Sequence, residues 1–274
     1  MLDDGLSEGG GRCRGCARVS HLRPPPIADV GAQIRYHGLV HRNAGGNPAD
    51  TDLRTRPAYS VDEAARYLRL APVTLRSWTV GRSYPSSAGP RTSAPLLKLA
   101  ARRPPTLSFW NLVEAHVLRA LRTDHGVSVH ALRKALRYAE DALGIENLLL
   151  RQDLLTEAGR IFLERYGQLI DLSNSGQLAM RRVLEAHLRR VEWDPRELPL
   201  RFYPFITADA IAEERTIAID PRVKFGRPVI RRVGVSTQVI AARIDAGEPL
   251  DALADDYGLT TEEVERAALY ERAA

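Results

Sequence analysis

The stretch from Tyr59 to Trp78, YSVDEAARYLRLAPVTLRSW, carries the clearest helical pattern of apolar and polar positions in the chain. Its first half places four apolar residues at the i, i+3, i+4 and i+7 positions of one helix face: Val61, Ala64, Ala65 and Leu68. Ser60 can cap this helix, and Glu63 three residues later completes the sequence of a capping box. The pattern predicts a short amphipathic helix.

A turn over residues 69–71 separates this helix from a second one. Pro72 suits the first position of the second helix, where its missing N–H would be unpaired in any case. Leu75 and Trp78 share the inner face. Side chains that suit base edges and phosphates fall on the outer face: Thr74, Arg76 and Ser77. Two short helices around a tight turn are typical of a helix-turn-helix that enters a DNA groove, with an ordinary packed helical hairpin as the alternative.

The pattern further along the chain predicts more helices and a few short strands. A loop rich in Gly, Ser and Pro (81–95) precedes an apolar run (96–100), which is a candidate wing strand, and a basic turn (102–105). Helices capped by Ser108 and Ser128, a hairpin within 161–172, a helix from about 177 to 191 and a strand over 200–203 follow. We therefore expect residues 56–205 to form one helix-rich domain with a small sheet.

Residues 206–274 have the pattern of a second, smaller unit. Two short strands, 216–220 and 228–231, flank a turn at 221–227. Three helices follow, beginning after Ser236, near Leu250 and after Thr260, where Glu263 completes a capping box. The apolar residues assigned to the inner faces of the first and last of these helices include Val239 and Leu269. The expected fold class is mainly α with small β elements, ending in a three-helix domain that resembles a helix-turn-helix.

Residues 1–55 show little periodicity and are rich in Gly and Pro, so we expect a disordered extension, with a start site placed too far upstream as another explanation. Cys13 with Cys16, and His37 with His41, have zinc-ligand spacings. The 20 intervening residues exceed the usual finger linker, and the apolar residues that would pack around a finger are missing. We therefore expect no metal and no cofactor.

Charge is unevenly distributed along the chain. The formal net charge is only +5, but residues 59–104 hold eight basic and two acidic residues, whereas 250–265 hold six acidic and no basic ones. Because phosphates attract cations and repel carboxylates, the first region suits DNA and the last suits a protein partner. No apolar run is long enough to span a bilayer and no signal peptide is visible, so a cytoplasmic protein without a membrane partner is expected.

Residues 59 to about 122 resemble the MerR-type winged helix-turn-helix, through SVDEAARYL, APVTLRSW, a wing and LSFWNLVEAHVLRALR. The resemblance implies major-groove contact for Thr74, Arg76 and Ser77 and phosphate contact for Arg82 and Lys98. Two positions depart from the family: Arg69 replaces the usual Gly of the turn, and Ala71 replaces a Ser cap. The long dimerisation helix and the metal-binding cysteines of MerR regulators are also missing from the pattern.

The C-terminal region is similar to the small domain, formerly of unknown function, found in VapB-type antitoxins. The similarity rests on DPRVKFGRPVI and AGEPLDALADDYGL. It implies a PIN-like ribonuclease toxin as partner, whose carboxylate cluster binds Mg²⁺ or Mn²⁺. The basic residues on the turn and strands are candidates for partner contact, with solvated surface as the alternative: Arg222, Lys224, Arg227, Arg231 and Arg232. Asp220, Gly226 and Pro228 are expected to shape the turn.

Three functions follow from these patterns. The first is an antitoxin that binds operator DNA as a homodimer, represses its own operon and masks the toxin. The second is a stand-alone MerR-like regulator with an effector. The third, an enzyme, is disfavoured because the sequence offers no nucleophile–base pair, phosphate-cradling glycine loop or catalytic metal set.

Overall fold

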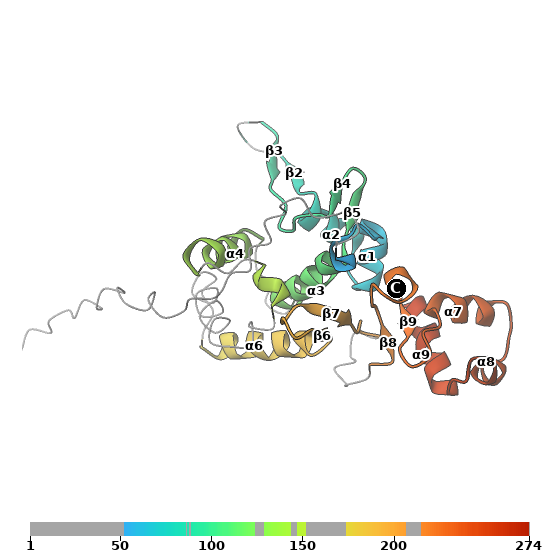
Figure 1. Ribbon diagram of the computed structural model, residues 1–274. Coiled ribbons are helices and arrows are strands. Elements are labelled where there is room, and N and C mark those ends of the chain that lie inside the picture. Colours follow the sequence, from blue (N-terminus) through green and yellow to red (C-terminus); the bar gives the residue numbers. More distant parts are fainter. Residues whose placement is uncertain are drawn as a thin grey trace, which may run out of the picture. The chain divides into compact units, whose positions relative to one another are not determined.

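Two short helices form where the apolar pattern predicts them (Figure 1). They are α1 (Val61–Tyr67) and α2 (Pro72–Thr79). The Ser60 hydroxyl caps α1 by accepting the Glu63 amide, but the Glu63 carboxylate accepts the Tyr67 hydroxyl at 2.9 Å, so the predicted capping box forms in part. This computed structural model describes residues 52–85, 87, 89–123, 129–143, 147–151, 174–206 and 215–273.

Two hairpins follow the helix pair and correct the prediction for this region. β2 (Arg82–Tyr84) pairs with β3 (Arg91–Ser93), so residues 81–95 contain a hairpin. β4 (Ala101–Arg102) pairs with β5 (Pro105–Leu107), which also pairs with β1 (Tyr59–Ser60), and the basic turn at 102–105 is confirmed between β4 and β5. Residues 96–100 are not a strand, because the Leu96 and Leu97 amides both donate to the Trp78 carbonyl at the end of α2.

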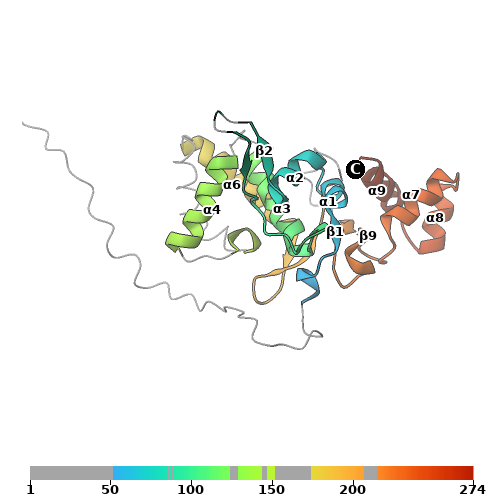
Figure 2. The same ribbon diagram turned by 90° about the horizontal axis from the view of Figure 1, so that it is seen from above.

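α3 (Phe109–Thr123) runs through the middle of the main core (Figure 2). Its neighbours include α6 (Asn174–Leu188), η3 (Leu148–Leu150) and β7 (Pro199–Phe202), while α4 (Val129–Leu143) contacts η3. The predicted helix over 177–191 ends three residues early, because Val191 begins β6 (Val191–Trp193) and pairs with β7. The predicted hairpin within 161–172 lies outside the described residues.

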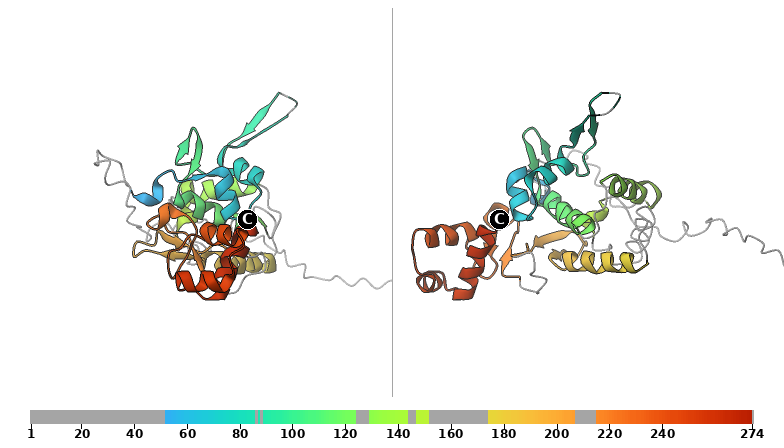
Figure 3. Two further views of the ribbon diagram at one scale, coloured as in Figure 1. Left: turned by 90° about the vertical axis from the view of Figure 1, so that its right-hand side faces the viewer. Right: turned by 180° about the vertical axis from the view of Figure 1, so that it is seen from behind.

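The C-terminal residues form a two-stranded ribbon and three helices (Figure 3). β8 (Ile217–Ala218) pairs with β9 (Val229–Ile230) around η5 (Lys224–Gly226). α7 (Thr237–Asp245), α8 (Leu250–Tyr257) and α9 (Thr261–Arg272) follow, and the capping box of Thr260 and Glu263 is confirmed. Two inner-face assignments are wrong: Val239 and Leu269 are exposed, and Tyr270 is buried in place of Leu269.

Tyr270 belongs to the same apolar core as α1, α2 and α3, as do Ile217 and Ile219. A second, smaller core is enclosed by α7, α8 and α9. The C-terminal residues therefore contribute to both cores. The expected domain boundaries at 56–205 and 206–274 stay predictions.

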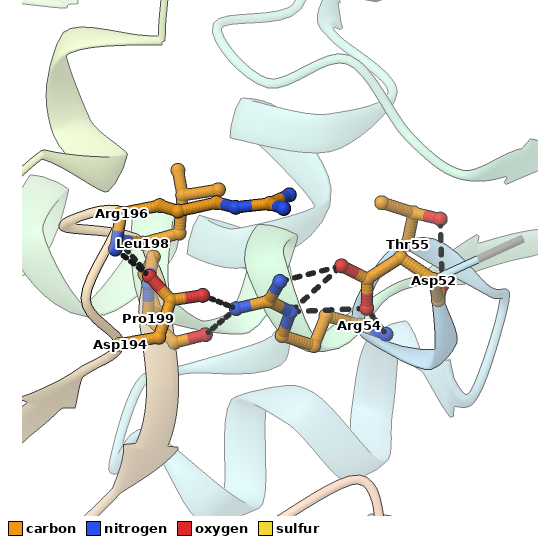
Figure 4. Close-up of polar contacts among 7 residues, drawn as sticks. All are labelled: Asp52, Arg54, Thr55, Asp194, Arg196, Leu198 and Pro199. Atoms are coloured by element: carbon orange, nitrogen blue, oxygen red, sulfur yellow. Dashed lines mark hydrogen bonds and ion pairs between the residues drawn. The ribbon is translucent and has the colours of Figure 1, made fainter.

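Arg54 ties the start of the described chain to the β6–β7 hairpin (Figure 4). Its guanidinium pairs with Asp52 at 2.6 Å and with Asp194 at 2.7 Å, and it donates to the Pro199 carbonyl. Burial opposes ionisation of Asp194, but hydrogen bonds from the Leu198 amide and Arg54 outweigh it and lower its pKa. Residues 53–55 form η2 (Leu53–Thr55), so the last residues of the predicted disordered extension are folded. Cys13, Cys16, His37 and His41 lie outside the described residues.

Within the described ranges, no helix is both long and apolar enough to cross a membrane.

Candidate DNA interface and C-terminal turn

The outer face of α2 presents Arg76 most fully. Leu75 and Trp78 are buried, as predicted, whereas Thr74 and Ser77 are half-buried and Arg76 is exposed. The Ser77 hydroxyl donates to the Thr74 carbonyl at 2.7 Å, a local hydrogen bond common for Ser in helices. Arg76 is therefore the predicted base-contact residue with the greatest reach.

Arg76 also lies beside the start of α1. Its guanidinium approaches the Asp62 carboxylate at 3.7 Å, and both side chains are largely exposed. An exposed pair at this distance contributes little to stability, about 0–1 kcal/mol. The contact can hold the guanidinium in place, and a phosphate or a guanine edge could replace the carboxylate without a large penalty.

The sequence patterns missed two apolar residues on this face. Val73 is 75% exposed and Val80 is 47% exposed. They lie three residues before and four residues after Arg76, which places all three on one side of the helix. An exposed aliphatic side chain in the major groove can contact the thymine methyl group. Counting helical spacing outward from Arg76 would have found both residues.

Arg69 occupies the turn position where MerR-type sequences usually have Gly. Its φ is +55°, a left-handed conformation that destabilises a non-Gly residue by about 1–2 kcal/mol. Its side chain donates to the Tyr270 carbonyl at 2.6 Å and to the Ile206 carbonyl at 3.2 Å. The guanidinium also lies 4.8 Å from the centre of the Tyr270 ring. Contacts with Ile206 and Tyr270 therefore hold the turn in a left-handed backbone conformation that Gly would adopt without strain.

Arg82 lies at the base of the β2–β3 hairpin, directly after α2. Gly81 makes the connection with φ +92°, and a Cβ atom there would lie 2.3 Å from the Ser93 carbonyl oxygen. The Ser93 hydroxyl bonds both the amide and the carbonyl of Arg82, which fixes the register at this point. Every residue of β2 is exposed. Figures 1 and 3 show this hairpin and the β4–β5 hairpin extending in the same general direction from the helix pair.

Lys98 has an exposed side chain on a firmly held backbone segment. The Asn111 side-chain amide donates to the Lys98 carbonyl at 3.0 Å, and its oxygen accepts the Ala100 and Ser108 amides. Asn111 also donates to Glu114 at 2.8 Å. Burial raises the pKa of Glu114 to about 7, despite this hydrogen bond. A buried polar cluster thus positions the segment that carries Lys98.

The C-terminal turn is built around the Asp220 carboxylate, whose side chain is 1% exposed. Arg222 donates to its two oxygens at 3.0 and 2.8 Å, and Arg201 donates to it at 3.1 Å. Burial opposes ionisation of Asp220, but the hydrogen bonds from Arg222 and Arg201 outweigh it and hold the pKa of Asp220 below its ordinary value. Asp220 therefore shapes the turn, as its sequence position suggested.

The five cations predicted to contact the partner differ in the contacts they make within this chain. Arg227 pairs with Glu63 and lies near the Tyr67 hydroxyl. Arg232 pairs with Glu263 at 2.7 Å, and the Arg231 guanidinium lies 5.7 Å from the Tyr203 ring centre. Arg222 is bound to Asp220 as described above. Lys224 is exposed and has no polar side-chain partner within the described part of the chain.

Comparison with known proteins matches both regions. Residues 57–136 match a family described as "Putative DNA-binding HTH domain", and residues 217–270 match one described as "Protein of unknown function (DUF433)". The chain is 28% identical over 238 residues to "Putative antitoxin VapB45" of Mycobacterium tuberculosis (strain ATCC 25618 / H37Rv), covering 80% of this chain and 96% of the relative. The crystal structure of Rv2018 from Mycobacterium tuberculosis matches with a TM-score of 0.55 at 25% identity, covering 77% of this chain and 97% of that one.

These matches divide the predicted site residues into two groups. Thr74, Arg76, Ser77, Arg82 and Lys98 all fall inside the helix-turn-helix match, and the five C-terminal cations fall inside the DUF433 match. The helix pair thus lies within a match to a family described as "Putative DNA-binding HTH domain", and the chain is similar to an antitoxin over most of its length. The role of each individual residue stays a prediction.

Proposed function

We propose that this protein is the DNA-binding antitoxin of a type II toxin–antitoxin pair. In this proposal it binds operator DNA as a homodimer, represses its own operon and holds a PIN-like ribonuclease in an inactive complex. The observation that carries the proposal is the similarity to an antitoxin along 96% of that relative's length. The separate helix-turn-helix match, with an exposed arginine on its second helix, supports the DNA-binding half.

The proposed DNA reader is a MerR-like winged helix-turn-helix. α2 enters the major groove, where Arg76 contacts base edges and Thr74 and Ser77 contact bases or phosphates. The hairpins after α2 serve as the wing, with Arg82 and Lys98 on phosphates. Six basic side chains of this region are exposed and suit a polyanion: Arg76, Arg82, Arg91, Lys98, Arg102 and Arg103.

The proposed toxin contact lies in the C-terminal region. Because Arg222, Arg227 and Arg232 are already paired with carboxylates of this chain, coverage of the RNA groove is favoured over insertion of several arginines into the toxin's metal site. Lys224 and Arg231 are the exposed cations of this set without a carboxylate partner among the described residues, so they are the ones available to a carboxylate of the partner.

Two measurements test the proposal. The full chain should bind DNA from upstream of its own gene more tightly than unrelated DNA, and co-expression should restore growth to cells that make the neighbouring ribonuclease. Selective DNA binding without any toxin, together with a small molecule that alters it, would instead identify a stand-alone regulator.

The test needs the full chain, because removal of residues 206–274 would also take Tyr270 from the main core. A loss of DNA binding in such a truncated protein would not separate the two activities.

A further inference from the structure

Phe225 is the most exposed of the large apolar side chains that the structure describes, with 91% of its surface accessible. It lies in η5, between β8 and β9. Isolated exposed apolar residues are normal on protein surfaces, so exposure by itself says little.

Lys224 and Phe225 both have left-handed backbone conformations, with φ of +47° and +57°. A bulky side chain in this region is strained by about 1–2 kcal/mol, and Gly or Asn would relieve the strain. Strained residues of this kind persist where the surrounding structure imposes their conformation, and they occur frequently at binding sites.

The surroundings of the turn do impose this conformation. The Tyr59 hydroxyl donates to the Gly226 carbonyl at 3.1 Å, and Gly226 is buried against the Tyr59 ring. Arg227 on the next position pairs with Glu63 of α1. Contacts on the C-terminal side of Phe225 thus fix the turn while the phenyl ring itself remains in solvent.

Charge around the ring favours a protein over DNA. Arg222 and Arg227 are paired with Asp220 and Glu63, so among residues 221–227 Lys224 is the cation without a carboxylate partner in the described part of the chain. Arg231, beyond the turn, lies over the Tyr203 ring. One ammonium group gives a polyanion little to bind. An apolar pocket with a carboxylate at its rim would accommodate the ring and pair with Lys224.

We propose that Phe225, with Lys224 beside it, is the anchor by which this protein binds its toxin, inserting the phenyl ring into an apolar pocket edged by a carboxylate. This inference rests on the proposed function. The centre of the toxin interface would then be Phe225, an aromatic side chain that the charge pattern did not indicate, and not the arginines of the turn.

The test compares variants of the full chain for binding to the toxin encoded by the neighbouring gene, measured by calorimetry with purified proteins. Phe225→Ala should weaken binding about 30-fold or more, as truncation of an aromatic anchor does. Phe225→Gly should weaken toxin binding similarly while raising the melting temperature, because Gly relieves the backbone strain.

Lys224→Glu should also weaken toxin binding, because the new carboxylate would repel the carboxylate of the partner. Val239→Ala, an exposed apolar position on α7, is the control and should change the Kd less than twofold.

The possible results separate this inference from the proposed function. If the wild-type chain binds the toxin and Phe225→Ala binds it equally well, the anchor is wrong and the antitoxin function stands. If Phe225→Ala keeps the toxin and loses operator DNA, the ring is a DNA contact and the inference is overturned. If the wild-type chain does not bind the toxin, both proposals fail. If Phe225→Gly lowers the melting temperature, the turn is not strained and the inference is overturned.

Discussion

The helix-turn-helix region and the C-terminal turn are both rich in arginine, but they use it differently. Around α2 and its hairpins, six cations are exposed. Among the described residues, Arg76 is the one of these six that lies near a carboxylate, that of Asp62, at 3.7 Å. Around η5, Arg222, Arg227 and Arg232 are bound to carboxylates of the same chain. The first set of cations is available to a polyanion, whereas the second set is already paired within the chain.

The comparison shows why the number of basic residues is a poor guide to an interface. A surface ion pair in water adds little, but a buried carboxylate such as Asp220 needs its arginines to remain charged. Substitutions should therefore affect stability at the turn and DNA binding at the helix-turn-helix.

The largest expected effect is at Asp220. Asp220→Ala should lower the free energy of unfolding by about 3 kcal/mol, because it removes a buried carboxylate that accepts hydrogen bonds from the side chains of Arg201 and Arg222 and from the Arg222 amide. Chemical denaturation of the full chain, followed by circular dichroism, measures the change. An effect below about 1 kcal/mol would place Asp220 among weak surface pairs and remove the contrast between the two regions.

The Asp220 carboxylate should also make the free energy of unfolding depend on pH. Its pKa is lower in the folded protein than the ordinary 3.8, so the unfolded chain takes up the proton first as the pH falls. The stabilisation is therefore complete above about pH 5 and is lost as the pH falls below 3.8 through the folded pKa. Asp220→Asn should flatten this part of the stability profile.

The next effect concerns Gly226. A Cβ atom there would lie 2.1 Å from the Tyr59 hydroxyl oxygen, on a residue with φ +77°. Gly226→Ala should destabilise the protein by about 2 kcal/mol. Gly234→Ala is a matched control, since φ is +71° but the nearest atom is 3.8 Å away, and its effect should be about 1 kcal/mol.

A second substitution isolates the clash at Gly226. Tyr59→Phe removes the hydroxyl group, so in the double variant the added methyl group meets a ring carbon at 3.1 Å. Gly226→Ala should then destabilise the Tyr59→Phe protein less than it destabilises the wild type. Equal effects in the two backgrounds would show that the clash does not determine the preference for Gly.

A smaller effect is expected on DNA at Arg76. Arg76→Ala should weaken operator binding by about 1–3 kcal/mol if the guanidinium contacts a base, and leave the free energy of unfolding nearly unchanged because its pair with Asp62 is exposed. Fluorescence anisotropy on operator and unrelated DNA measures both affinities. An equal loss on the two DNAs would make Arg76 a phosphate anchor.

Local signals account for what the sequence predicted well. Apolar spacing and capping residues placed α1, α2, α8 and α9, because these depend on neighbours within a few positions. The β2–β3 hairpin was missed because five of its six strand residues are exposed, so no alternation of apolar residues marks it. The role of Arg69 was missed because its partner, Tyr270, is 201 positions away in the chain. The candidate DNA residues followed from helix geometry, but the pairing of the C-terminal arginines depends on tertiary structure.

The smallest expected effect comes from replacing a lysine by Ala, once beside the helix-turn-helix and once in the C-terminal turn. Lys98 and Lys224 are both exposed lysines, one after α2 and the other in η5. If Lys98 neutralises a phosphate, Lys98→Ala should reduce the slope of log K against log salt concentration by about 0.9, with a loss of affinity that is nearly the same for any DNA sequence. Lys224→Ala should leave that slope unchanged and weaken toxin binding instead. The comparison fails if both variants reduce the slope, because the C-terminal turn would then lie on DNA together with the helix-turn-helix.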